Sequence, residues 1–404
     1  MEPQGSKEIT IATSGLKSKP GTEYFIYFNV TTTEPEPLIP VGHEIAYEQF
    51  RLPIEPGERT FATGGPALKV SAEGNELTAS SSKVNFVFDK KTGLVSSYKV
   101  GGTEYFKDGF GLQPNFWRAP NDNDYGNGNP KRLQVWKQSS KNFNVVDANI
   151  VMDGKDAVLT ANYLLAAGNL YIVTYRISPS GVVKADFTFT STDMEAAKTE
   201  ASEATLMATF TPGSDAARKA ASKLEVPRIG VRFRLPAEMN QVEYFGRGPE
   251  ENYIDRNAGT LIDLYKTTAD QMYFPYVRPQ ENGHHTDSRW LTLNKKGGKG
   301  LTIYADKTIG FNALRNSVED FDGEETVSRP YQWLNRDAGE LVHDESKAKD
   351  QLPRKTHIND ITPRNFVEVC VDMKQQGVAG YNSWGARPEP VSYTHLRAHE
   401  TDSY

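Results

Sequence analysis

Alternation of apolar and polar residues with a period of two runs through most of the chain, and it constrains the fold more than any other feature. It is clearest in five segments rich in aromatic and β-branched residues: 24–30, 84–88, 171–177, 183–189 and 301–304. Successive side chains of a strand point to opposite faces, so this pattern predicts strands with one buried face. Turn signals separate them, at 90–93, 178–181 and 295–300. The sequence therefore predicts an all-β protein of antiparallel sheets packed face to face.

Two segments depart from this pattern and predict helices, 194–203 and the alanine-rich 215–223. The composition excludes several function classes. The net charge of −6 argues against a nucleic-acid partner, because phosphate binding needs a basic face. The sequence contains no run of about 18 apolar residues, so it predicts no membrane span. The single cysteine, Cys370, lies in the alternating run 366–372, and we expect it to be buried in a strand.

Four motifs rich in Trp, Pro, Asn and Gly follow one another along the chain. In order, they are Asn115-Phe-Trp-Arg-Ala-Pro-Asn-Asp-Asn-Asp124, Phe245-Gly-Arg-Gly-Pro-Glu-Glu-Asn-Tyr-Ile-Asp-Arg256, Pro275-Tyr-Val-Arg-Pro-Gln-Glu-Asn-Gly283 and Asn382-Ser-Trp-Gly-Ala-Arg-Pro388. Together they resemble the C-terminal small-chain domain of β-galactosidases in glycoside hydrolase family 2. His357 and Asp372 also fall where that family's pattern has them. The resemblance covers about residues 8–390.

The resemblance implies a domain organisation. Residues 63–391 would form the small-chain domain, a large antiparallel super-sandwich similar to galactose mutarotase. Residues 1–62 resemble the end of the immunoglobulin-like β-sandwich, domain 4, that precedes it, with a linker at 57–66. Such a sandwich needs about seven strands and ~100 residues, so we expect the chain to start inside a domain. We expect 323–355 to be a surface excursion, and 392–404 to be a non-native tail on a truncated super-sandwich.

The resemblance also implies a reaction. The parent enzyme would be a retaining β-galactosidase that removes terminal β-D-galactose from β-galactosides such as lactose, using one Glu as acid/base and another as nucleophile. Both, with the magnesium and sodium ions, would sit mainly on a TIM barrel upstream. We therefore expect no catalytic residue and no metal in this chain, and no activity from it alone. The expected partners are the galactoside, the barrel and further copies of the enzyme. The compartment, cytoplasm or periplasm, stays open.

Trp384 in the fourth motif is the one substrate-binding residue that the resemblance assigns. In the family the matching Trp reaches the barrel's pocket and forms an apolar wall for the sugar. A flat indole covers the C–H face of a pyranose well, while its N–H can find an acceptor. The alternative is a structural Trp in a loop. Tyr381 stands where the family usually has an acidic residue, which leaves the path of this loop open.

Other residues of the motifs favour structural interpretations. Glu250 and Glu251 are adjacent on an extended chain and point apart, whereas the two carboxyls of a retaining glycosidase face each other at ~5–5.5 Å. We expect Glu251 and Asn252 to be structural hydrogen-bond partners. Arg247 stands where the lac-type enzyme of this family has an apolar residue, and the sequence does not explain this difference.

Three further features resemble ligand sites. His284 and His285 are expected to diverge rather than share a metal. The oxygen-rich segment 121–129 is compatible with calcium, but its spacing is not that of an EF-hand, and a hydrogen-bonded loop is favoured. The glycine-rich 297–300 lacks the ending of a phosphate loop and predicts a hairpin.

Three function classes stay open. The first, which we favour, is the C-terminal part of a β-galactosidase. The second is a separate small subunit of a heteromeric β-galactosidase, although a subunit boundary should fall between domains. The third is a non-catalytic carbohydrate-binding or aldose-epimerase-like protein, because fold likeness alone does not carry function.

Overall fold

The structure is a computed structural model that describes residues 5–190, 225–322, 332–335, 340–343, 355, 357–382 and 385–388. Both predicted helices, most of 323–355, Trp384 and the segment 392–404 lie outside the described residues. The chain divides into two compact units, residues 1–62 and 63–404.

The first unit contains one antiparallel hairpin, of β1 (Phe25–Thr31) and β2 (Glu44–Arg51). The predicted strand at 24–30 is confirmed as β1. Apolar side chains of the hairpin remain exposed, among them Val30, Ile45 and Phe50. Two strands alone bury too little apolar surface to form a stable core.

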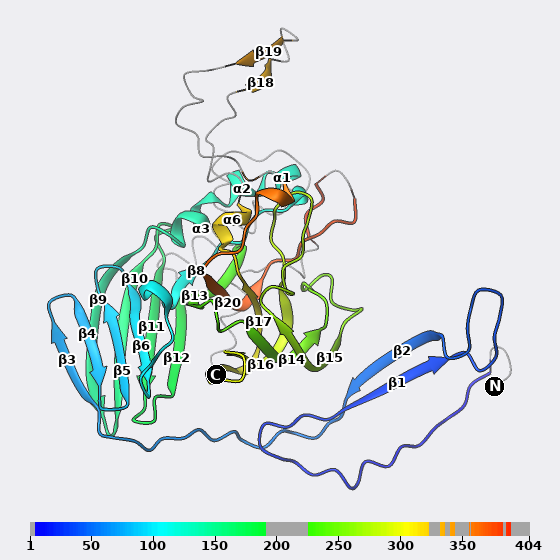
Figure 1. The fold of residues 1–404 in the computed structure, drawn as a ribbon, viewed down its shortest axis with the longest axis horizontal. Coiled ribbons are helices and arrows are strands. Elements are labelled where there is room, and N and C mark those ends of the chain that lie inside the picture. The colour runs from blue at the N-terminus through cyan, green and yellow to red at the C-terminus, as the bar shows by residue number, and fades with distance from the viewer. Residues whose placement is uncertain are drawn as a thin grey trace. The chain divides into compact units, whose positions relative to one another are not determined.

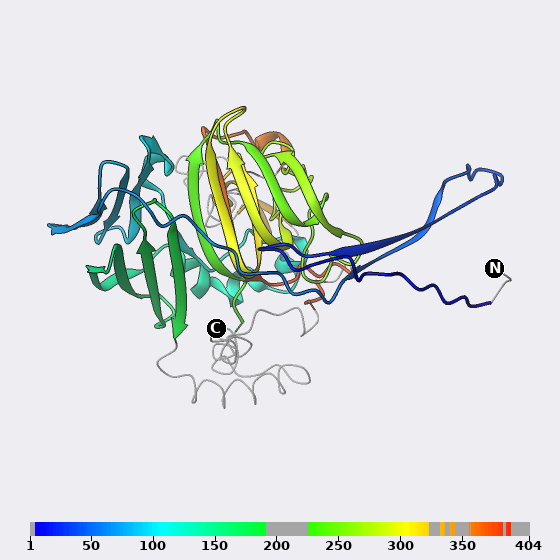
Figure 2. The same ribbon diagram turned by 90° about the horizontal axis from the view of Figure 1, so that it is seen from below.

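The second unit begins with two smaller antiparallel sheets. One has the order β3-β4-β5-β6-β7 and the other β12-β11-β10-β9. Their strands are β3 (Lys69–Glu73), β4 (Glu76–Ser80), β5 (Val84–Asp89), β6 (Leu94–Val100), β7 (Thr103–Glu104), β9 (Asn144–Asp153), β10 (Asp156–Leu164), β11 (Leu170–Ile177) and β12 (Val183–Thr190). Buried and half-buried residues alternate strictly along β5, and the ring of Phe86 lies 5.4 Å from that of Tyr175 in β11. The two sheets therefore form face-to-face layers (Figure 2).

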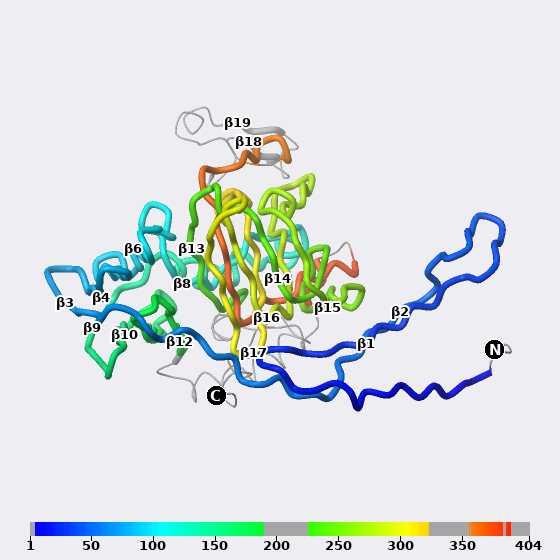
Figure 3. The backbone as a smooth tube through the Cα atoms, turned by 60° about the horizontal axis from the view of Figure 1, so that its bottom comes forward, coloured from blue at the N-terminus to red at the C-terminus, as the bar shows by residue number. Residues whose placement is uncertain are grey.

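A seven-stranded antiparallel sheet follows, in the order β15-β14-β16-β17-β20-β13-β8. Its strands, seen side by side in Figure 3, are β8 (Gln113–Asn115), β13 (Arg228–Pro236), β14 (Gln241–Gly248), β15 (Leu261–Thr268), β16 (His285–Asn294), β17 (Gly300–Leu314) and β20 (Phe366–Gln375). Cys370 is buried in β20, as predicted. Phe106 contacts Phe233 of β13 at 5.6 Å between ring centroids, so one apolar core runs from the smaller sheets into this one.

Short helices lie at one end of the sheets (Figure 1). Those labelled there are α1 (Asp122–Gly126), α2 (Asn129–Arg132), α3 (Gln134–Ser139) and α6 (Val318–Phe321). The chain also forms the 3₁₀ helices η1 (Lys107–Gly109) and η3 (Ile358–Asp360). A small hairpin joins β18 (Gln332–Asn335) to β19 (Glu340–His343). The sequence predicted none of these helices, because three to six residues are too few to show a helical period.

The all-β architecture predicted from the alternation is confirmed, since every strand pair in the described residues is antiparallel. The glycine-rich 297–300 forms the predicted hairpin turn between β16 and β17. Within the described residues, the helices are all too short or too polar to cross a bilayer.

Candidate functional site

The loop after β20, residues 376–382, leads directly into the fourth motif. Its backbone is unusual, because Ala379 has a φ of 55° and Gly380 a φ of 103°. Residues other than glycine rarely adopt a positive φ, so side chains around the loop must hold this course. Three side chains from the first and second motifs do so.

Two of these side chains bind the carbonyl oxygens of the loop. Arg118 donates from Nη2 to the carbonyl of Gly377 at 3.2 Å, and Asn121 donates from Nδ2 to the carbonyl of Val378 at 3.1 Å. Arg118 is only 2% exposed. The first motif therefore holds the loop through its carbonyl oxygens.

Asp255 of the second motif binds the N–H groups of the same loop. Its Oδ1 accepts from the Val378 N–H at 3.0 Å and its Oδ2 from the Ala379 N–H at 2.8 Å. A Cβ added to Gly377 would overlap the Asp255 carboxylate, so the approach requires glycine. We call Arg118, Asn121 and Asp255 with residues 377–379 the loop clamp.

A buried ion pair holds the first motif in shape. Asp124 lies 2.9 Å from Arg118 Nη1 and also accepts from Asn129 Nδ2 at 2.8 Å. Asn121 and Asp124 exchange hydrogen bonds between side chain and backbone, at 3.0 and 2.9 Å, and so cap α1. The oxygen-rich segment 121–129 is thus held by hydrogen bonds, but residues 122–126 form the short helix α1 instead of the expected loop. The Asp124 oxygens accept from an arginine, an amide and a backbone N–H.

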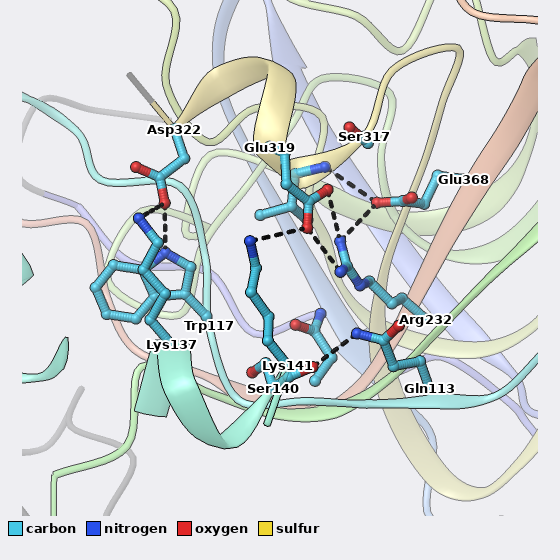
Figure 4. A network of polar contacts seen from close by, with 12 residues as sticks. Gln113, Trp117, Lys137, Ser140, Lys141, Arg232, Ser317, Glu319, Asp322 and Glu368 are labelled. Carbon is cyan, nitrogen blue, oxygen red and sulfur yellow. Dashed lines mark hydrogen bonds and ion pairs between the residues drawn. The ribbon is translucent and has the colours of Figure 1, made fainter. Parts of the chain in front are cut away.

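A second polar network anchors the Trp of the first motif (Figure 4). Trp117 donates from Nε1 to Asp322 at 2.9 Å, and Lys137 reaches the same carboxylate at 2.7 Å. Beside it, Arg232 of β13 pairs with Glu319 at 2.7 Å and with Glu368 at 3.3 Å. Burial alone would raise the pKa of Glu319, but the Arg232 guanidinium holds that pKa well below its usual range.

The second and third motifs are bound together through Glu251. Its carboxylate accepts from the Tyr276 hydroxyl and from the Gly283 N–H at 2.6 Å, and it lies 3.2 Å from Arg256. This confirms Glu251 as a structural hydrogen-bond partner. Asn252 has the same role, because it accepts from the Thr286 N–H at 2.9 Å.

The third and fourth motifs both contact the first. Arg278 pairs with Asp122 at 2.9 Å and lies 4.0 Å from the centre of the Tyr125 ring. Gly385 sits so close to the backbone of 126–127 that a Cβ would not fit there. Tyr381, the departure noted in the sequence, donates to the carbonyl of Arg387 at 2.8 Å and so spans the fourth motif. The structure therefore brings all four motifs together around the loop clamp.

Trp384, the predicted substrate-binding residue, lies outside the described residues, between Asn382 and Gly385. Arg247, which the sequence left unexplained, binds Asp287 at 2.5 Å and the carbonyl of Thr260 at 2.9 Å, so its role is structural.

A buried charged cluster that the sequence did not reveal lies behind the third motif. Arg228 of β13 faces Asp372 of β20 at 3.2 Å and Glu281 at 2.6 Å, and His284 Nδ1 is 3.7 Å from Asp372. All four are at most 5% exposed. Among the residues that the structure describes, both Asp372 oxygens and the His284 Nδ1 find no hydrogen-bond partner.

Burial raises the pKa of Asp372 to about 7, against the opposing effect of the Arg228 charge. Burial, followed by the Arg228 charge, lowers the pKa of His284 well below its usual value. His285 turns away, with its ring nitrogens 3.0 Å from the carbonyl of Gly283 and 3.1 Å from that of Pro249. The two histidines therefore diverge as predicted. Across the described part of the chain, His, Cys, Asp and Glu side chains form no group of three arranged to hold a metal.

Exposed apolar side chains surround the loop clamp on the surface. Val277 is 79% exposed, Tyr381 65% and Phe274 49%, and Ile254 and Ile358 are each 37% exposed. The Ile358 N–H donates to the Val277 carbonyl at 3.1 Å, which ties η3 to the third motif. We call these five residues the apolar rim. Exposed apolar side chains in such a number are typical of a surface that packs against another domain.

Sequence comparisons place this architecture among known proteins. Residues 80–402 match the family described as "Beta galactosidase small chain", and residues 1–53 match "Beta-galactosidase, domain 4". The β-galactosidase of Priestia megaterium is 28% identical over 395 residues, which is 97% of this chain and 32% of that protein. That of Kluyveromyces lactis is 30% identical over 272 residues, which is 66% of this chain and 24% of that protein. The chain thus spans a third or less of the length of these relatives.

A comparison with solved structures finds galactose 1-epimerase from Lactobacillus acidophilus, with a TM-score of 0.23 and 7% identity over 76% of this chain and 97% of that one. A likeness at that level is too low to bear on function.

Proposed function

The chain belongs to the β-galactosidase small-chain family, and from that premise we propose that it is the C-terminal part of an enzyme that hydrolyses β-galactosides such as lactose. In this proposal the fourth motif extends the galactose site of a catalytic barrel, and Trp384 supplies an apolar wall for the sugar. The catalytic carboxylates, the magnesium and the sodium belong to the barrel, and no step assigned to this chain uses them.

One observation carries the proposal: the four motifs, which are spread over more than 260 residues of sequence, converge on the loop that leads to Trp384. Arg118 and Asp255 bind the loop itself, Arg278 binds Asp122 of the first motif, and Gly385 packs against the backbone of 126–127 directly after that motif. A loop held by two buried or bidentate polar contacts is rigid enough to present one side chain in a fixed place. Aromatic side chains suit that purpose for sugars, because they cover C–H faces and exclude water.

The apolar rim supports the same proposal. It surrounds the base of the fourth motif with exposed side chains such as Val277 and Phe274. We assign it to packing against the barrel, because a residue can reach a neighbouring domain's pocket only if the two surfaces meet around it. Burying these side chains there would fix the distance between Trp384 and the pocket.

The first test is hydrolysis of a chromogenic β-galactoside by the pure chain. We expect no turnover above the buffer rate, because retaining hydrolysis needs two positioned carboxyls and both lie on the barrel. Adding the barrel-bearing part of the enzyme should produce turnover, and that part alone should be much less active. Turnover by the pure chain that a substitution within it abolishes would refute the proposal.

A further inference from the structure

We propose that Asp255 is a positioning residue for the galactoside site: its carboxylate sets the course of residues 377–379 and so the direction in which the chain enters the fourth motif. This inference rests on the proposed function, since it concerns the same site. It adds a residue of the second motif that would act through the backbone of the loop, by its bonds to Val378 and Ala379.

The argument begins with how completely Asp255 engages the loop. Its two oxygens accept from two consecutive backbone amides, those of Val378 and Ala379, at 3.0 and 2.8 Å. Hydrogen bonds from N–H groups to a carboxylate are shorter and stronger than those to a neutral acceptor. Because the two amides belong to adjacent residues, fixing both also fixes the rotation of the peptide plane between them.

The backbone that Asp255 holds would not keep this shape unaided. Ala379 sits at a φ of 55°, a region that residues with a Cβ rarely populate. Such conformations persist only where the surroundings determine them, and they concentrate at functional sites. Arg118 and Asn121 bind only the carbonyls of this segment, so Asp255 is the side chain that holds its N–H groups.

Asp255 is also well placed to connect the loop with the rest of the site. It lies four residues after Glu251, which binds Tyr276 and the Gly283 N–H of the third motif. The short segment 251–255 therefore contacts the third motif through one carboxylate and the loop through another. A shift of this segment moves both.

The alternative is that Asp255 only stabilises the fold. The two roles separate in experiment, because a stability contact lowers the melting temperature and leaves the kinetics of the folded enzyme unchanged. A positioning residue changes the kinetics while the melting temperature stays nearly constant. Asp255 is exposed at the surface, so its loss should cost the core little.

The first experiment measures amide hydrogen exchange by mass spectrometry in the 404-residue chain, in a peptide that spans residues 376–382. Asp255→Ala removes both acceptors, and Asp255→Asn keeps one oxygen but turns an NH₂ group toward the other amide. Glu250→Gln is the matched control, since it removes the same charge from an exposed side chain five residues away. We expect exchange to quicken roughly tenfold or more in the Ala variant, less in the Asn variant, and not in the control. Unchanged exchange in Asp255→Ala would overturn the inference.

The second experiment measures kcat and KM for a β-galactoside in the full-length enzyme that contains this chain. We expect kcat/KM to fall roughly tenfold or more in Asp255→Ala, with Asp255→Asn between it and the wild type, Glu250→Gln unchanged and melting temperatures within a degree or two. Trp384→Ala is the reference. If Trp384→Ala lowers kcat/KM but Asp255→Ala does not, the inference fails and the proposed function stands. If Trp384→Ala has no effect, the proposed function fails, and the inference fails with it.

Discussion

At the scale of single residues, Asp372 is a buried acid whose pKa burial raises far above its ordinary value. It is fully buried in β20, with Arg228 at 3.2 Å, His284 at 3.7 Å and Glu281 on the far side of Arg228. With Asp372 ionised, the cluster carries one unbalanced negative charge in a site without water contact. With Asp372 protonated, the remaining Arg228–Glu281 pair is neutral overall.

This cluster predicts a pH dependence of stability with a definite sign. The pKa of Asp372 is about 7 in the folded chain and about 3.9 when unfolded. Between these values the folded state holds a proton that the unfolded state lacks. The stabilisation is therefore complete below about pH 4 and declines as pH rises to 7, by up to about 1.4 kcal/mol per pH unit.

The measurement is urea unfolding of the wild type and Asp372→Asn between pH 4 and 8. The two should be similar at pH 4, and the Asn variant should be increasingly more stable toward pH 7, because it cannot ionise. Asp306→Asn, an exposed position in β17, is the control and should follow the wild type at every pH. A constant difference between wild type and Asp372→Asn across this range would contradict a protonated Asp372.

At the scale of elements, the sequence anticipated strands well and polar assemblies poorly, for a physical reason. A strand such as β5 shows its burial in its own six residues, as alternation. The loop clamp joins Arg118, Asp255 and Val378, whose chain separations exceed 100 residues, and no local pattern pairs them. The motifs marked where polar contacts would gather, but not which side chains would meet. Asp255 in particular carried no sequence signal for its role in the clamp, because an Asp next to an Arg is common on protein surfaces.

Helix α1 gives the prediction at this scale. Asp124 is buried and paired with buried Arg118 at 2.9 Å, whereas Asp122 of the same helix is 69% exposed and pairs with Arg278. Asp124→Asn leaves the Arg118 charge uncompensated in the interior, which costs ~3–5 kcal/mol. Asp122→Asn loses only a surface pair, worth under ~1 kcal/mol.

Chemical denaturation followed by tryptophan fluorescence compares these two variants, since Trp117 and Trp136 lie close by in sequence. We expect the unfolding midpoint to fall strongly for Asp124→Asn and hardly at all for Asp122→Asn. Equal midpoints for the two variants would mean that the buried pair does not hold the first motif in shape.

At the scale of the whole molecule, the chain spans about a third of the length of its Priestia megaterium relative. The hairpin of β1 and β2 and the apolar rim both expose apolar side chains that a folded protein normally covers. The sequence anticipated the first of these from the strand count. It did not anticipate the rim, because Ile254, Val277 and Tyr381 come together only when the second, third and fourth motifs converge.

The measurement that tests this account most directly is the steady-state kinetics of Trp384→Ala and Trp384→Phe in the full-length enzyme, with melting curves recorded in parallel. Losing the aromatic wall should cost ~1–3 kcal/mol, so kcat/KM for a galactoside should fall roughly ten- to a hundredfold in Trp384→Ala while the melting temperature holds. Trp384→Phe should recover part of the loss, because a smaller ring still covers some of the sugar's C–H face. Wild-type kinetics in Trp384→Ala, or a loss of activity that only follows a loss of fold, would contradict the claim that this chain completes the galactoside site.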